Sequence, residues 1–318
     1  MNRSKVFAPA EKIPPVQLQR FAWAVLVYFV AVILWGTIVR ATGAGAGCGS
    51  HWPLCNGTVL QHAASTNTLI EFTHRVTSGL SLLSVLGLLI WTWLATERGH
   101  LARVASACAV VLTVVEAILG ALLVALGLTA QSQSPLRPLF LALHLTNTLL
   151  LLAALALTAH LLNRKAGYRW ETIRLVAPWG ALLGILVVLA VGVTGSLAAL
   201  GDTLFPASSL TGALTQDFAS SSNWLVRWRW THPMIALFAS AFLLWILLRA
   251  ARETGKESRR GLSVLVVVLL ISVYLLGLLD AALLAPVWAQ VAHLLAADSL
   301  WVTLVVLTAS LTLEPRWE

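Results

Sequence analysis

The chain has 318 residues, of which 58% are apolar and only 11% are charged. A typical globular domain carries about 25% charged residues, so this composition, with its mean hydropathy of +0.85, predicts a membrane protein. It excludes a soluble enzyme, a nucleic-acid binder, a disordered chain and a disulfide scaffold, and the net charge of +8 is therefore interpreted by the location of the basic residues.

The apolar residues gather in eight stretches that are long enough to cross a bilayer, whose hydrocarbon core needs about 20 residues of helix. Runs of this length are predicted to be helices, because only helices and closed barrels satisfy every backbone polar group in lipid. We therefore predict an all-α integral membrane protein with eight transmembrane helices. In chain order they are expected near Phe21–Val39, Leu69–Leu94, Val104–Leu128, Leu139–Leu161, Leu175–Leu197, Trp230–Leu248, Leu262–Leu279 and Val287–Leu311.

The basic residues are concentrated on one side of these predicted spans. They lie in the N-terminal tail, in the second, fourth and sixth loops and in the C-terminal tail, and the fourth loop runs from Asn163 to Arg174. By the positive-inside rule, this distribution places both termini in the cytoplasm. The first apolar run is of span length, so we expect a membrane helix there rather than a cleavable signal. The expected location is the plasma membrane or an equivalent energy-coupling membrane.

The two halves of the chain carry the same short motifs in the same order, which indicates an internal repeat. Four spans repeat as four spans, and this even number gives both halves the same orientation about an axis along the membrane normal. The sequence thus predicts two pseudo-symmetric four-helix bundles, residues 1–162 and 163–318. The matches are Thr73-His74 with Thr231-His232, Leu119-Gly120 with Leu276-Gly277, and Ala142–Leu145 with Val291–Leu294.

Four of the eight histidines lie inside even-numbered spans, roughly 5–9 Å below the outer helix ends. For a single intramembrane histidine, an interhelical hydrogen bond is the simpler interpretation. Four at one depth, in two matched pairs, instead favour a ligand site. Two facing imidazoles suit a six-coordinate haem iron, whereas zinc usually takes a third protein ligand. The four are His74, His144, His232 and His293; the others, His51, His62, His100 and His160, are interpreted as solvated polar residues.

One feature distinguishes the two halves. Glu71 lies three residues before His74 and therefore on the same helix face, and Arg75 follows it. The corresponding residues of the second half are Arg229 and Pro233. A carboxylate beside a haem can act as a base, a proton relay or a charge stabiliser. The alternative is an interfacial ion pair between Glu71 and Arg75 that has no chemical role.

The first outer loop carries Cys48 and Cys55, which have no counterpart in the second half. On the predicted topology they face an oxidising compartment, so we expect a disulfide, either a structural clip or a redox-active pair above the first-half site. Glu116, in the third span, either feeds protons or bonds to a neighbouring helix. Arg227 and Arg229, before the sixth span, are candidates for haem propionate partners, or they are interfacial arginines.

This pattern resembles the haem A synthase family, membrane enzymes that convert haem O to haem A. The resemblance covers nearly the whole chain, and its most specific part is Glu71-x-x-His74-Arg75 together with Cys48 and Cys55. A second cysteine pair, found in some family members, is absent from the corresponding loop of the second half, so a role that needs that pair does not carry over.

The resemblance implies an oxidoreductase that oxidises a methyl group of substrate haem O to a formyl group. His74 and His144 would bind haem O, His232 and His293 would hold a resident haem b, and Glu71 would be catalytic, with Arg75 as a charge or propionate partner. Candidate partners are haem O synthase and a terminal oxidase under assembly, besides the lipid bilayer, an unidentified electron donor and a second copy of the chain. The alternatives are a bis-histidine b-type cytochrome for electron transfer and a haem carrier.

Overall fold

The computed structural model describes residues 14–58, 65–162, 173–175, 179–253 and 257–315. In these ranges, eight helices are long and apolar enough to cross a membrane, which confirms the predicted all-helical integral membrane fold. The helices of the first half are α1 (Val16–Ala41), α2 (Thr66–Ala95), α3 (Leu101–Ala125) and α4 (Leu136–Leu162). Those of the second half are α5 (Trp179–Leu204), α8 (Thr231–Glu253), α9 (Glu257–Ala282) and α10 (Val287–Thr312).

Most helix ends differ from the sequence-based boundaries, and α3 and α5 show two of the differences. Helix α3 ends at Ala125 rather than Leu128, because Gly127 has a positive φ of 63° and the Leu128 N–H donates to the Leu123 carbonyl. This is the hydrogen-bonding pattern of a Schellman cap. The predicted fifth span began at Leu175, but this residue lies in a short strand, and α5 runs instead from Trp179 to Leu204.

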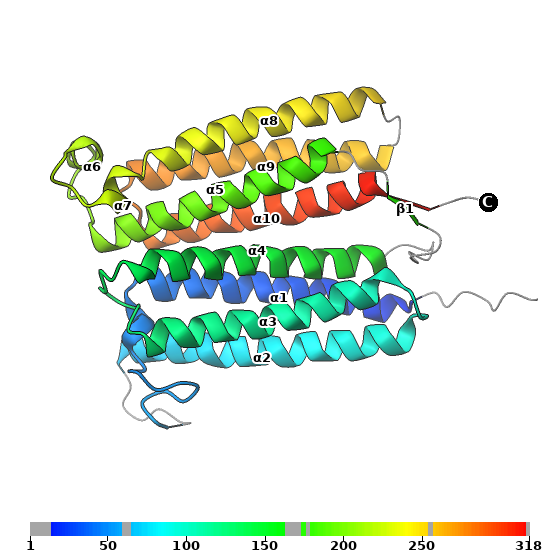
Figure 1. Ribbon diagram of the computed structural model, residues 1–318, viewed down its shortest axis with the longest axis horizontal. Helices are drawn as coiled ribbons and strands as arrows, with labels where there is room; N and C mark the ends of the chain where they lie inside the picture. Colours follow the sequence, from blue (N-terminus) through cyan, green and yellow to red (C-terminus); the bar gives the residue numbers. More distant parts are fainter. Residues whose placement is uncertain (1–13, 59–64, 163–172, 176–178, 254–256, 316–318) are drawn as a thin grey trace, which may run out of the picture.

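The long helices form two groups of four, which Figure 1 shows as two layers. In the first half each helix packs on the next, and α4 returns to α1; in the second half α5, α8, α9 and α10 repeat this closed order. Between the halves, α4 contacts both α5 and α10, and α1 contacts α10. Since α4 and α10 occupy equivalent places in the repeat, this arrangement is consistent with a pseudo-twofold relation.

The surface between the two halves is the most buried part of the described structure. Trp301 of α10 is 1% exposed, and its indole N–H donates to the Leu149 carbonyl of α4 at 2.7 Å. Near the C-terminal end of α1, the guanidinium of Arg40 donates to the Ala199 carbonyl, the Thr203 hydroxyl and the Gln290 side chain. Polar contacts therefore join the halves in addition to apolar packing.

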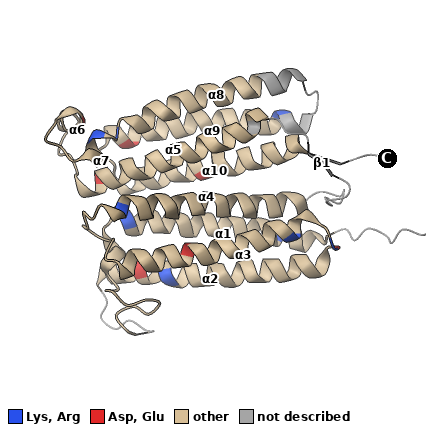
Figure 2. Ribbon diagram, in the orientation of Figure 1, with Lys and Arg blue, Asp and Glu red and all other residues tan. Residues whose placement is uncertain are grey.

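The loops and short elements that connect the long helices differ between the two ends of the molecule. The loop after α1, with the short 3-10 helix Ala44–Ala46, lies at the same end as α6 (Leu210–Phe218) and α7 (Trp224–Arg227). At the opposite end, β1 (Ile173–Leu175) pairs antiparallel with β2 (Leu313–Pro315), a small ribbon that the sequence analysis did not predict. Charged residues lie mostly toward the helix ends in Figure 2, as expected of helices whose middle parts face lipid.

Candidate functional site

His74 and His144 lie on α2 and α4, which are not sequential neighbours in the closed order of the first bundle. Each lies eight residues after the first residue of its helix, about 12 Å along the axis. They are deeper than predicted, because both helices begin three residues earlier than their apolar stretches. His74 packs closely on α1, where a Cβ added at Gly36 would lie 3.1 Å from its Cε1. The absence of a side chain at Gly36 therefore makes room for this imidazole.

The second bundle brings His232 of α8 and His293 of α10 together. Their ring centroids are 6.4 Å apart, and the rings are nearly perpendicular, at 89°. Both rings pack on glycines of the preceding long helix: a Cβ at Gly195 would lie 2.9 Å from His232 Cε1, and one at Gly277 would lie 3.0 Å from His293 Cε1. The Thr194 hydroxyl contacts His232 Nδ1 at 3.2 Å, which orients this ring.

This geometry fits a metal that is bound by two imidazoles. Two metal–nitrogen bonds of about 2 Å, with about 1 Å from each nitrogen to its ring centre, span about 6 Å, close to the separation of His232 and His293. In the described part of the chain, the buried Nδ1 atom of His74 has no hydrogen-bond partner. Among the same residues, no three potential ligands gather as a metal cluster, so each donor set is a pair. A pair of imidazoles suits a six-coordinate haem iron.

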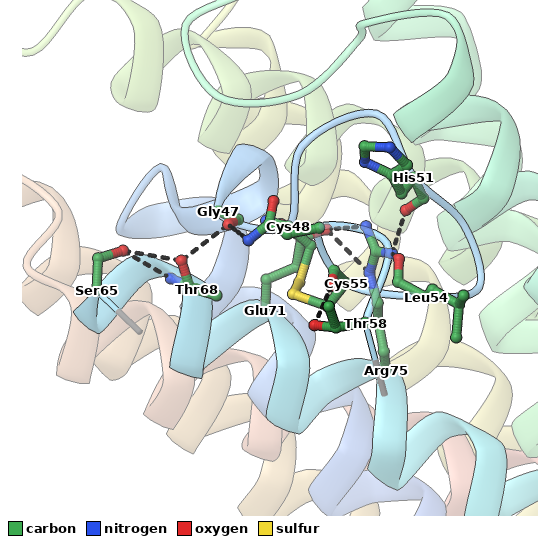
Figure 3. The surroundings of a disulfide bond; sticks show 11 residues. Gly47, Cys48, His51, Leu54, Cys55, Thr58, Ser65, Thr68, Glu71 and Arg75 are labelled. Carbon is green, nitrogen blue, oxygen red and sulfur yellow. Dashed lines mark hydrogen bonds and ion pairs between the residues drawn. A yellow bond between two sulfur atoms is a disulfide. The ribbon is translucent and has the colours of Figure 1, made fainter. Parts of the chain in front are cut away.

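The disulfide between Cys48 and Cys55 is present, and its loop is attached to the helix that carries His74 (Figure 3). Cys48 and Cys55 are both buried. The Thr68 hydroxyl donates to the Gly47 carbonyl at 2.8 Å. A Cβ added at Gly47 would lie only 2.5 Å from the backbone of α2, so this glycine permits the close approach of the loop to the helix.

Glu71 and Arg75 of α2 also bind the disulfide loop. Oε2 of Glu71 accepts a hydrogen bond from the Cys48 backbone N–H at 2.8 Å, and Oε1 forms an ion pair with Arg75 at 2.5 Å. Arg75 also donates to the carbonyls of His51 and Leu54, as Figure 3 shows. The ion pair that the sequence left as an alternative for Glu71 is thus observed. The carboxylate is buried, and the disulfide loop holds it in place.

Glu116, on α3, lies beside a candidate ligand although the sequence analysis did not include it in the site. Its Oε1 is 3.3 Å from Nδ1 of His144 and accepts a hydrogen bond from the Thr148 hydroxyl. Its Oε2 accepts one from Asn147 at 2.6 Å. Of the two alternatives for Glu116, the bond to a neighbouring helix is confirmed. In the sequence, Glu116 lies one helical turn before Gly120 of the repeated Leu119-Gly120 motif. This spacing puts both residues on the same face of the third span, and it is the signal that could have included Glu116 in the site.

Arg227 and Arg229, the two arginines that precede α8, have different surroundings. Arg229 forms ion pairs with Asp202 of α5 at 2.7 Å and with Asp217 of α6 at 2.8 Å. Its guanidinium therefore has carboxylate partners within the protein and ties α6 to the second bundle. Arg227 is exposed on α7. The haem propionate role stays a prediction for both residues, as it does for Arg75.

Two of the remaining histidines correct the sequence analysis. His100 and His160 were expected to be solvated, but they are 5% and 7% exposed. His100 precedes α3, and its Nδ1 accepts the Ala102 N–H, so it caps the helix, a role that imidazole plays less often than Ser or Asp. His51 is exposed as expected, and His62 lies outside the described residues, as does most of the basic loop 163–174.

The fold and these features define a polytopic helical membrane protein with a pair of intramembrane histidines in each half. The chain belongs to the COX15-CtaA family, described as cytochrome oxidase assembly protein, whose sequence model matches residues 19–305. It is 42% identical over 294 residues to a protein of Thermus thermophilus named protoheme IX farnesyltransferase, a match that covers 92% of this chain and 48% of the relative.

Shorter matches connect the chain with proteins named heme A synthase. The one from Alkalihalophilus pseudofirmus is 38% identical over 126 residues, which is 40% of each chain. The one from Bacillus licheniformis is 38% identical over 128 residues, 40% of this chain and 39% of the relative. The chain thus spans about half the length of the Thermus relative and aligns with less than half of the two heme A synthases.

Proposed function

We propose that the protein is a haem A synthase, an oxidoreductase that converts a methyl group of haem O to a formyl group. Membership of the family and the relatives named heme A synthase support this proposal. The reaction replaces two hydrogens of the methyl group with one oxygen atom, which is a four-electron oxidation of that carbon. A site for it needs a place for the substrate haem, a route for electrons and a group that handles protons.

The observation that carries the proposal is the unequal surroundings of the two histidine pairs. The first bundle has two buried or half-buried carboxylates near its pair, Glu71 on α2 and Glu116 on α3. The corresponding positions of the second bundle are Arg229 and Val273. A protein that only transfers electrons needs no such difference, because axial histidines suffice. One reactive site and one supporting site explain the asymmetry.

In this assignment, His74 and His144 hold the substrate haem O, and His232 and His293 hold a resident haem b. The haem b supplies one-electron redox chemistry when it is bound. Glu71 stabilises positive charge or receives a proton near the substrate, and Arg75 with the Cys48 N–H fixes the position of its carboxylate. The disulfide keeps the loop of Cys48 in place above α2 and so supports Glu71.

The cellular setting follows from the same assignment. We place both termini in the cytoplasm and both histidine pairs toward the outer face, with residues 1–162 forming the substrate half and residues 163–318 the haem b half. The Thermus relative, about twice as long and named for protohaem farnesylation, favours an enzyme that supplies haem O as a partner. The family description favours a terminal oxidase under assembly as the recipient of the product.

The test is extraction and mass analysis of the haems from the purified protein, produced in cells that also make haem O. We expect haem b together with haem A or a hydroxylated intermediate, with or without residual haem O. His74→Ala should lose haem O and keep haem b, whereas His232→Ala should lose the low-spin spectrum of haem b. Haem b alone, with haem O available in the cells, would contradict the proposal and favour an electron-transfer cytochrome. Bound but unconverted haem O would indicate a carrier.

A further inference from the structure

Glu116 is a carboxylate inside a membrane helix that the proposed reaction does not yet use. Ionisable side chains are costly within a bilayer and mark functional positions or specific pairs. Two donors of α4 hold both oxygens of this carboxylate, Asn147 at Oε2 and the Thr148 hydroxyl at Oε1. Asn147 also donates to the Leu112 carbonyl of α3, so its position is fixed as well. The carboxylate is therefore held in one place.

That place is beside the imidazole of His144. Oε1 of Glu116 lies 3.3 Å from Nδ1 of His144, and this buried nitrogen has no hydrogen bond of regular geometry to any described residue. When Nδ1 carries the proton and faces a carboxylate, Nε2 is the nitrogen left for a metal. Histidines that bind metals commonly donate their second ring N–H to a carboxylate or carbonyl, which fixes the ring and raises the basicity of the ligand.

The second bundle provides an internal comparison. Val273 follows Glu116 by the same interval that separates Gly120 from Gly277, so Val273 is the repeat counterpart of Glu116. The counterpart of His144 is His293, which packs on Gly277, whereas a Cβ at Gly120 would meet no atom within 4 Å. The same place in the fold thus holds a charged carboxylate in the first half, whereas in the second half the side chain is apolar and His293 is hydrogen-bonded to the uncharged backbone of Val273. A purely structural helix contact would not require this difference.

We propose that Glu116 is a positioning residue for His144, and this inference rests on the proposed function. Its carboxylate accepts the Nδ1–H of His144, directs Nε2 to the iron of the first-half haem and increases the electron donation of the ligand. A negative charge next to the ligand favours the ferric state, so the first-half haem has a lower reduction potential than it would have without Glu116. The haem of the second half has no carboxylate at the corresponding position, so its reduction potential is not lowered in this way.

The test is a redox titration of the full-length protein, loaded with haem O without oxygen so that the substrate stays unconverted. Glu116→Gln removes the charge and keeps the shape. We expect haem O to remain bound and the ferric-to-ferrous ratio of the first-half haem, at a fixed potential, to fall about tenfold, which is about 59 mV for one electron. The second-half haem should keep its potential. The matched control is Thr148→Val, which removes a hydrogen bond to Glu116 but leaves the charge, and it should shift the potential far less.

An equal shift in both variants, or no shift in Glu116→Gln, would overturn the proposal and leave Glu116 as a helix contact. If Glu116→Gln does not fold, paramagnetic resonance of the unaltered protein decides. A stronger axial donor narrows the spread of ferric g values, so the first-half haem should show a narrower spread than the second-half haem, and equal spreads would refute the proposal. Failure of the proposed function has a different signature, since the first half of the unaltered protein would then bind no haem O.

Discussion

The close contact between Gly277 and His293 leads to a prediction for which the equivalent glycine of the first half provides the control variant. Gly277→Ala places a methyl group 3.0 Å from Cε1 of His293. Carbon atoms in contact prefer about 3.5–4.0 Å, so the imidazole must retreat by about 0.5 Å or more. Metal–ligand distances are held to within about 0.2 Å, so a shift of this size is large for an axial ligand.

The expected cost in stability is smaller than the effect on the haem. Overpacking costs about 1–3 kcal/mol, and the better helix propensity of alanine offsets about 1 kcal/mol of it. The free energy of unfolding should therefore fall by up to about 2 kcal/mol. The haem that we propose for the second half should lose its low-spin absorption spectrum or be lost from the protein.

The assay combines haem spectra with thermal unfolding of the detergent-purified protein. The matched control is Gly120→Ala, the repeat counterpart, where the added methyl group meets no atom within 4 Å. It should leave the second-half spectrum unchanged and, through the better helix propensity of alanine, keep or slightly raise the unfolding temperature. Identical spectra and unfolding temperatures for the two variants would refute the reasoning.

Three further predictions concern the disulfide loop and the contact between the halves. Glu71→Gln should retain both haems but lose conversion of haem O, measured by haem extraction; undiminished haem A would contradict a catalytic role. Cys48→Ser should lower the free energy of unfolding by about 2–3 kcal/mol, as loop closure over seven residues implies, and weaken rather than abolish activity; an unchanged unfolding temperature would argue against a structural clip. Arg40→Met removes three hydrogen bonds between the halves and should cost about 2 kcal/mol at about 0.6 kcal/mol each. The exposed Arg20→Met on the same helix is its control, and equal unfolding temperatures of the two variants would show that Arg40 does not stabilise the contact.

Several properties could be predicted from the sequence because they depend on neighbouring residues in one helix. The spans follow from the length and apolarity of each stretch, and the order of the repeat follows from short motifs. The helix ends were less accurate: α2 and α4 extend past their apolar stretches, so His74 and His144 lie deeper than expected. Capping chemistry sets such ends, as at Gly127, and hydropathy does not register it.

The sequence by itself determined that this chain crosses a membrane with eight helices and that four histidines and a cysteine pair are unusual, and it predicts that the two halves repeat. Only the tertiary structure decided how the polar groups are paired. It joined Glu71 to the backbone of Cys48, gave Arg229 two carboxylate partners, and placed Glu116 beside His144. Each of these side chains can reach several partners in an unfolded chain. The packing of the helices and their loops selects one of them, because a buried polar group in a membrane protein must be satisfied within the protein.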